Sequence, residues 1–166
     1  MKLSGYSLLL LLFCGVAQAQ VASHTVNLII SPSVQLKSIS GNDATTLNFV
    51  SAEDVIGGIT QTEAGSYEVR ANTNWVVTAK ASSAFFKTSV SGDDSEIPSS
   101  ILYIKANKGE EAEFLPLSMD GIALQSGGKP SKDRDNTFSV DYMAQPGIDA
   151  SPGIYSIDVL LTVTGN

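Results

Sequence analysis

The sequence predicts an all-β protein whose strands form a two-layered antiparallel β-sandwich. Apolar and polar residues alternate with period two in many short segments, which is the pattern of half-buried strands. Clusters of Gly, Pro, Asn and Asp separate these segments and supply the backbone geometries of turns. Helical spacing of apolar residues is nearly absent. Together these observations favour strands joined by tight turns.

Eight segments have the strand pattern, at residues 24–30, 33–39, 45–50, 67–71, 74–81, 101–106, 137–144 and 155–163. Pro32 cannot donate a ladder hydrogen bond, so it is expected to interrupt a strand or to lie at a sheet edge. Seven to eight short strands in one domain favour an immunoglobulin-like β-sandwich, and a closed barrel is the alternative.

One short helix is expected between the strands, in the stretch VSAEDVIGG at residues 50–58. Ser51 is a favourable N-cap residue, and Glu53 and Asp54 suit the positive end of the helix dipole. Gly57 and Gly58 are expected to end the helix.

The last strand closes the chain in GIYSIDVLLTVTGN, residues 153–166. Its apolar face carries Tyr155, Ile157, Val159, Leu161 and Val163. Leu160 is the one apolar residue on the opposite face, which indicates that both faces are partly covered. An unpaired strand leaves its backbone polar groups without partners, so this strand is expected to pair within a sheet. With residues 137–144 it forms either a hairpin or an arch between the two sheets.

The first 19 residues are expected to be a cleaved signal peptide. Lys2 precedes a short apolar run, and Ala17-Gln18-Ala19 fits the signal peptidase rule. The run is too short to cross a membrane. Lipidation at Cys14 is the alternative, and the bulky Phe13 disfavours it. The protein is therefore predicted to be exported to the periplasm, the cell surface or the extracellular medium.

The mature chain, residues 20–166, is expected to be one domain without a disulfide, because Cys14 is the only cysteine. It would hold 17 acidic residues and 9 basic ones (10 minus Lys2), a net charge of −8. The basic residues are scattered, so nucleic acid is not expected as a partner. No second apolar segment is long enough to predict an integral membrane span.

The sequence predicts no catalytic residue, no cofactor and no metal site, and hence no enzymatic activity. His24 is the only histidine and lies in a predicted strand, and no Gly-x-Ser-x-Gly motif is present. Ser126 and Lys129 match Ser-x-x-Lys without its companion motifs. No His and Cys cluster suits zinc. The acidic loops at 92–96 and 132–136 lack the calcium-loop pattern and are interpreted as solvated turns rather than a calcium site.

Three aromatic residues are candidate contacts for a ligand or another subunit. Trp75 is the only tryptophan, and it is expected to fill the space between the sheets; stacking on a glycan or a partner is the alternative. Phe85 and Phe86 are adjacent, so their side chains point to opposite faces of a strand. One ring is expected in the core, and the other is expected to be exposed as a contact.

Three stretches resemble small secreted proteins of Bacteroidetes-type Gram-negative bacteria: LNFVSAEDVIGGI (47–59), YEVRANTNWVVTAKAS (67–82) and NTFSVDYMAQPGIDASPGIYSIDVLLTVTGN (136–166). The last stretch also resembles the closing strands of secreted pilin-like β-sandwich subunits, where a Gly-x-Tyr turn opens the final strand; here it is Gly153-Ile154-Tyr155. The resemblance implies an envelope location and a structural or adhesive role, as in a fimbrium. Many pilin subunits carry a disulfide, and this chain has none.

The expected function is that of a secreted, non-enzymatic structural or adhesive protein of the bacterial envelope. In pilin-like assemblies an N-terminal segment completes the sheet of a neighbour. Here this segment would be VASHTVNLII, residues 21–30, with Val26, Leu28 and Ile30 as the exchanged side chains. The simpler interpretation makes it the first strand of its own sandwich. The alternative function is a monomeric extracytoplasmic module that binds carbohydrate or protein.

Overall fold

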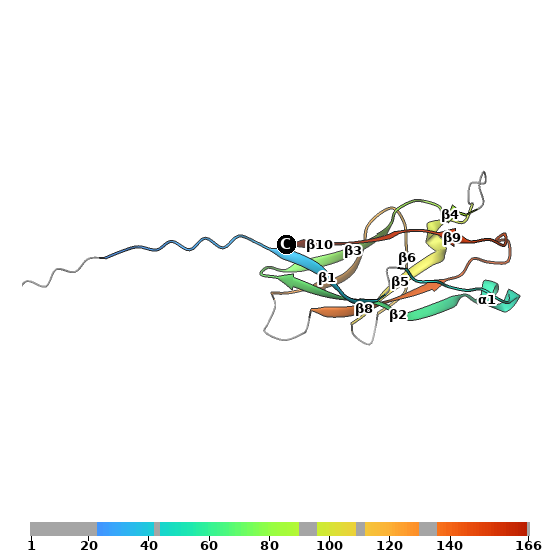
Figure 1. Cartoon of the computed structure of the whole chain (residues 1–166), viewed down its shortest axis with the longest axis horizontal. Coiled ribbons are helices and arrows are strands. Elements are labelled where there is room, and N and C mark those ends of the chain that lie inside the picture. The colour runs from blue at the N-terminus through green and yellow to red at the C-terminus, as the bar shows by residue number, and fades with distance from the viewer. Residues whose placement is uncertain (1–22, 42–43, 90–95, 109–111, 130–135, 166) are drawn as a thin grey trace, which may run out of the picture. The chain divides into compact units, whose positions relative to one another are not determined.

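The computed structural model describes residues 23–41, 44–89, 96–108, 112–129 and 136–165 (Figure 1). The chain divides into two units at residue 30. We call residues 23–30 the tail and the unit from Ser31 onward the body. The expected signal peptide, with Cys14, and most of the two acidic loops lie outside the described residues.

The body is all-β, and its sheets are antiparallel. A five-stranded sheet has the order β1-β2-β8-β5-β6, and a three-stranded sheet has the order β10-β3-β7. The strands of the first are β1 (Val34–Gly41), β2 (Ile59–Ala71), β8 (Thr137–Ala144), β5 (Leu102–Asn107) and β6 (Leu115–Pro116). Those of the second are β10 (Val159–Gly165), β3 (Trp75–Ala81) and β7 (Ile122–Gly127). A short third sheet pairs β4 (Lys87–Thr88) with β9 (Tyr155–Ser156).

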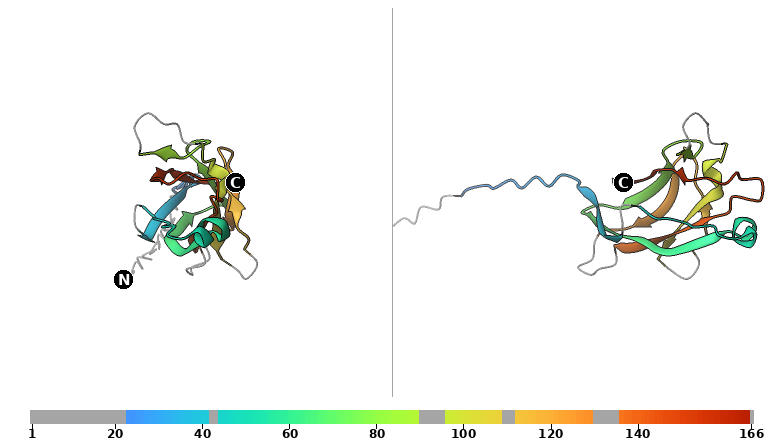
Figure 2. Two further views of the ribbon diagram at one scale, coloured as in Figure 1. Left: turned by 90° about the vertical axis from the view of Figure 1, so that its right-hand side faces the viewer. Right: turned by 45° about the vertical axis from the view of Figure 1, so that its right-hand side comes forward.

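The two larger sheets lie on either side of one hydrophobic core (Figure 2). In β3 the buried residues alternate with more exposed ones, as the period-two pattern predicted. The buried apolar residues are Val69, Ala71, Trp75, Val77, Ala79, Ala81, Leu102, Ile104, Ala106, Leu117, Phe138, Val140 and Ala144. The rings of Tyr67 and Phe138 stack in neighbouring strands, with centroids 5.6 Å apart. The all-β prediction is confirmed.

The predicted helix is present as α1 (Ala52–Gly57). The Ser51 hydroxyl accepts a hydrogen bond from the Asp54 amide at 3.1 Å, and the Asp54 carboxylate accepts one from the Ser51 amide at 2.9 Å. This reciprocal pair is a capping box. The hydrogen bond from the Val50 amide, with those from Ser51, lowers the pKa of Asp54. Gly58 follows the helix at a φ of 83°, which suits glycine. Sequence and structure agree because every contact here is local.

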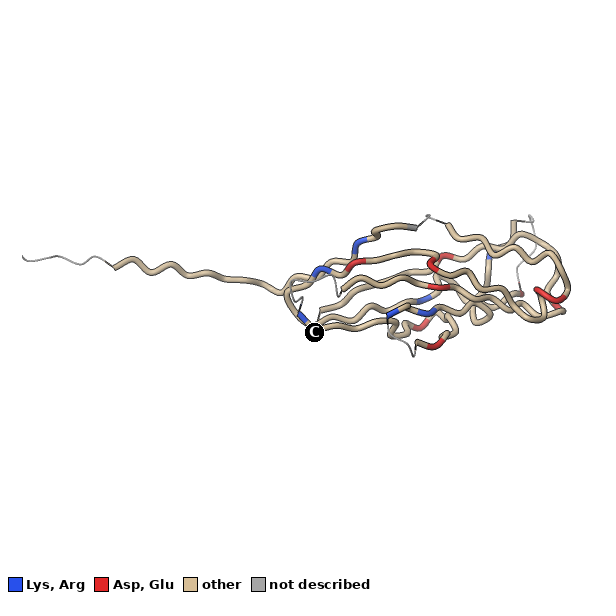
Figure 3. Tube along the Cα trace, turned by 90° about the horizontal axis from the view of Figure 1, so that it is seen from below, with Lys and Arg blue, Asp and Glu red and all other residues tan. Residues whose placement is uncertain are grey.

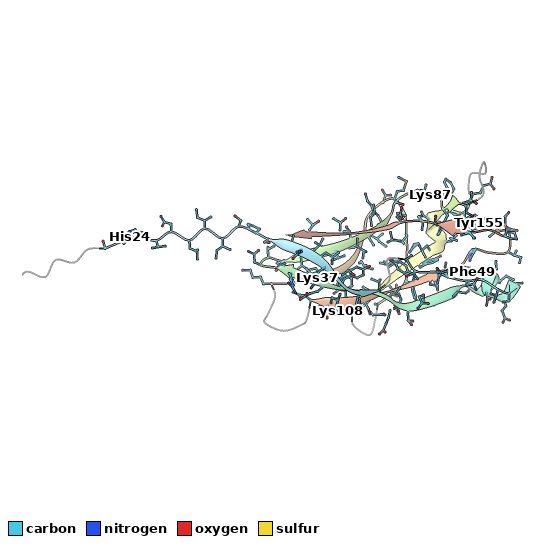
Figure 4. The ribbon with its side chains drawn as sticks, in the orientation of Figure 1. His24, Lys37, Phe49, Lys87, Lys108 and Tyr155 are labelled. Atoms are coloured by element: carbon cyan, nitrogen blue, oxygen red, sulfur yellow. The ribbon has the colours of Figure 1, made fainter. Side chains whose placement is uncertain are left out.

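Two predicted strands are wrong. Residues 24–30 contain no helix or strand, and neither do residues 45–50. Leu47 and Phe49 are nevertheless half-buried and pack against the core, and Phe49 is labelled in Figure 4. In that segment the alternation reflects burial on one side, without a neighbouring strand to supply ladder hydrogen bonds.

The closing strand differs from its prediction because it is split into β9 and β10. Three further strands, β4, β6 and β7, were not predicted. Of the two predicted arrangements the arch is the one formed, because β8 and β10 belong to different sheets. β10 does pair, but only with β3, so it lies at the edge of its sheet.

Candidate assembly surfaces

The tail exposes a run of aliphatic side chains. Val26, Leu28, Ile29 and Ile30 are 79%, 82%, 88% and 72% exposed. Among the described residues, no hydrogen bond joins residues 23–30 to any other group. The tail carries no charged Lys, Arg, Asp or Glu (Figure 3), and His24, labelled in Figure 4, is exposed there. An uncharged apolar segment with free backbone groups is suited to pairing with a sheet edge.

Asn72 fixes the start of the body. Its side-chain oxygen accepts a hydrogen bond from the Ser33 amide at 2.7 Å, and its side-chain nitrogen donates to the Ser31 carbonyl at 2.9 Å. The Asn72 amide also donates to the Ser33 carbonyl at 3.1 Å. These three bonds hold the chain before β1 in line with that strand.

Three of the four outer edges of the larger sheets carry features that protect an edge from pairing. β6 has only two residues and contains Pro116. β1 carries Lys37, labelled in Figure 4, and a register shift between Ser38 and Ser40. The β7 edge has a register shift opposite Val77 and Thr78. Short strands, lysine, proline and bulges all discourage edge-to-edge association.

The fourth edge, on β10, has none of these features. β10 is seven residues long, contains no proline and no charged residue, and pairs with β3 without a shift (Figure 3). Residues of an antiparallel pair alternate between hydrogen-bonded and non-hydrogen-bonded positions. The Ser82 amide donates to the Asp158 carbonyl at 2.9 Å, so even-numbered residues of this register bond to β3. The backbone groups of Val159, Leu161 and Val163 therefore face the free edge.

β1 and β10 are neighbours on this side of the core. A Cβ atom at Gly165 would lie 3.6 Å from Val34 Cγ1. Along this side, which we call the seam, the inward side chains are only half-buried although they pack against the core. They are Val34, Leu36, Val159, Leu161 and Val163. The seam is thus the flank where added apolar groups could complete the burial of the core.

The three aromatic candidates have different environments. Trp75 is 1% exposed, and it belongs to the core, as the sandwich interpretation expected. Its ring is not accessible for stacking on a glycan. Phe86 is half-buried and packs against the core, whereas Phe85 is 52% exposed beside the bridge that it forms with Pro98. Phe85 is therefore the aromatic residue placed to contact a ligand or partner.

Further exposed aliphatic residues lie at α1 and in residues 145–154, and the sequence patterns did not indicate them. Val50, Ile56, Ile148 and Ile154 are all exposed. The Gly147 amide donates to the Val55 carbonyl at 3.1 Å, and the Gln145 side chain donates to the Ile56 carbonyl at 2.7 Å. These bonds join the helix to the loop after β8. Isolated apolar residues in loops have no periodicity, so no sequence signal marks them as a group.

A buried carboxylate, Asp141, lies at the centre of the five-stranded sheet. It accepts hydrogen bonds from the Glu63 amide at 2.8 Å and from the Asn107 side chain at 2.5 Å, and Lys105 Nζ lies 3.1 Å away. Burial raises the pKa of Asp141, but these hydrogen bonds and the Lys105 charge outweigh it and hold the pKa below its usual value. Glu63 has a φ of 51° within the irregularity of β2. Asp141 therefore stabilises a strained bulge.

The described residues contain no group of three or more His, Cys, Asp and Glu side chains placed to hold a metal ion. Ser126 and Lys129 are both exposed, at the end of β7 and just beyond it. Within the part of the chain that the structure describes, no helix is long and apolar enough to cross a membrane.

No family model matches the sequence, and no curated protein is significantly similar to it.

Proposed function

We propose that this protein is an exported, non-enzymatic structural or adhesive subunit of the bacterial envelope. It has an immunoglobulin-like sandwich and associates with other copies by adding residues 23–30 as a strand. The observation that carries the proposal is the tail, which exposes Val26, Leu28 and Ile30 and makes no hydrogen bond within the described residues.

Energetics favour a sheet edge as the binding partner of the tail. Burying one large aliphatic side chain stabilises by about 1.5–3 kcal/mol. Fixing one residue of backbone costs about 1–2 kcal/mol, so ordering eight residues costs at least as much as burial of the four aliphatic side chains of the tail gains. Binding to a flat apolar surface would gain only the burial of the apolar side chains, whereas a sheet edge adds main-chain hydrogen bonds along the whole segment.

Truncation tests the proposal. Residues 20–166 are expected to form oligomers or fibres in size-exclusion chromatography and electron microscopy, and residues 31–166 are expected to be a folded monomer. Circular dichroism should show the same β content for the folded body of both proteins. Equal assembly with and without the tail would refute strand addition, and so would a monomer in both cases.

Substitutions within the tail distinguish strand pairing from non-specific hydrophobic association. The triple variant Val26→Asp, Leu28→Asp, Ile30→Asp should abolish assembly, because three carboxylates would enter an apolar interface. The matched variant Thr25→Asp, Asn27→Asp adds charge to the opposite face of the same strand and should assemble. If both variants lose assembly equally, the alternation of the tail has no role.

A monomeric carbohydrate- or protein-binding module is the second candidate, and the exposed ring of Phe85 favours it. Glycan-array binding that is lost in Phe85→Ala, by a protein that stays monomeric, would support this function over assembly. Phe86→Ala should instead lower stability, because that ring packs against the core.

A further inference from the structure

We infer that the free edge of β10 receives residues 24–30 of a second copy of this chain as an antiparallel strand. In this register Ile30 lies opposite Val159, Leu28 opposite Leu161 and Val26 opposite Val163. This inference rests on the proposed function and specifies its acceptor.

β10 is the acceptor because its edge is the one outer edge of the two larger sheets that has no feature discouraging strand pairing. β1, β6 and β7 are each shortened, charged, interrupted by proline or shifted in register, whereas β10 is a regular uncharged strand. Its free edge presents the backbone groups of Val159, Leu161 and Val163. An unprotected edge of this length is the site where an added strand gains the most hydrogen bonds.

The side chains of the two segments match in this register. Val26, Leu28 and Ile30 would face the seam, where Val159, Leu161 and Val163 are half-buried. On the opposite face, the tail has one aliphatic residue, Ile29, and β10 has one, Leu160, which is 44% exposed. The register places these two directly opposite each other. Such cross-strand apolar pairs stabilise a sheet by about 0.2–1 kcal/mol.

Length and charge agree with the same arrangement. Residues 24–30 cover the whole of β10, from Gly165 to Val159, and neither segment carries a charged Asp, Glu, Lys or Arg. The Asn72 bonds hold residues 31–33 in line with β1. Gly165 lies beside Val34, and Val159 is six residues away along β10, so Ile30, one residue before this fixed segment, cannot reach Val159 of its own chain; in this register the acceptor belongs to a second copy.

Disulfide trapping tests the pairing directly, because the mature chain has no cysteine of its own. Asn27 and Thr162 would form a non-hydrogen-bonded pair, in which the Cα atoms lie about 4.5 Å apart and a disulfide can form. Residues 20–166 carrying Asn27→Cys are mixed with the same chain carrying Thr162→Cys and oxidised. Intact mass spectrometry is expected to show the mixed dimer as the main cross-linked product.

The matched control replaces Thr162→Cys with Lys37→Cys, which places the thiol at the β1 edge on a position that is also exposed. This mixture is expected to form little or no mixed dimer. Cross-linking at Lys37→Cys in preference to Thr162→Cys would overturn the inference. If the double variant Asn27→Cys, Thr162→Cys closed within single chains at high dilution while the mixture formed no dimer, the acceptor would be the chain's own edge.

The assembly state of the unmodified protein separates this inference from the proposed function. If residues 20–166 assemble and residues 31–166 do not, but neither mixture cross-links, strand addition holds and β10 is the wrong acceptor. If residues 20–166 remain monomeric, the proposed function itself fails.

Discussion

Asp141 shows how one buried side chain stabilises an irregular strand. Its carboxylate satisfies the amide of Glu63, which has a positive φ, and pairs with Lys105 and Asn107. The alternation of residues 137–144 correctly predicted the strand, but it gives no sign that a carboxylate in that strand is buried. Asp141 is 1% exposed and accepts the hydrogen bond of Glu63 in the β2 irregularity. No sequence pattern predicts such a tertiary contact.

Replacing the carboxylate should weaken the fold in a pH-dependent way. Asp141→Asn leaves the Lys105 charge without its partner and should lower the free energy of unfolding by about 1–3 kcal/mol at pH 7. The pKa of Asp141 is lowered in the folded state, so its contribution is present above the unfolded pKa of about 4 and is lost as the pH falls through the folded pKa. Urea unfolding from pH 7 to pH 2 measures this dependence.

The same substitution at Asp158 is the control. Asp158 pairs with Lys87 at 3.9 Å with both side chains largely exposed, so Asp158→Asn should change stability by less than about 0.5 kcal/mol. Equal effects at the two positions would contradict the assigned role of Asp141.

Two adjacent glycines should differ sharply in their tolerance of a methyl group. A Cβ at Gly127 would lie 2.4 Å from Trp75 Cζ2, so Gly127→Ala forces the buried indole to move. We expect a loss of about 1–3 kcal/mol and an altered tryptophan emission spectrum. At Gly128 the nearest atom is 3.8 Å away, and Gly128→Ala should leave the melting temperature and emission nearly unchanged. A neutral Gly127→Ala would mean that Trp75 is loosely packed.

Among the helices and strands, the sequence predicts structure that depends on local contacts, such as a helix cap. It does not predict which strands pair with each other. The α1 helix was predicted from Ser51, Asp54 and Gly58 because capping is decided within a few residues. The strands of the core were predicted from alternation. Alternation at residues 24–30 could not tell whether a neighbouring strand exists in the same chain, because pairing partners are far apart in sequence.

A charge on the β10 edge should weaken assembly without unfolding the body. Leu160→Lys removes the apolar pair that Leu160 would form with Ile29 of the incoming strand, and lysine is an edge protector. Residues 20–166 with this change should assemble only at a higher protein concentration than the unaltered protein in sedimentation velocity. Ala123→Lys, on the exposed face of β7 at the other edge of the same sheet, should assemble like the unaltered protein. Loss of assembly in both variants would point to net charge as the cause.

At the scale of the whole molecule, much of the body follows from the sequence and the assembly surface does not. Period-two patterning led to the all-β class and to most of the strands that carry the core, including those of Trp75 and Val140. The order of strands in each sheet depends on long-range contacts that patterning does not encode. The open edge of β10 became visible only after its neighbours were known. The tail was identified as a candidate for exchange, yet its exposure is a property of the folded chain.

Hydrogen exchange at the tail reports on strand addition itself, because a strand in a neighbour's sheet must protect its amides. Exchange of residues 20–166 followed by mass spectrometry at rising protein concentration should show increasing protection of peptides that cover residues 23–30. Peptides that cover β10 should gain protection in parallel, at Val159, Leu161 and Val163. Protein that assembles while residues 23–30 exchange as fast as an unstructured peptide would contradict the account.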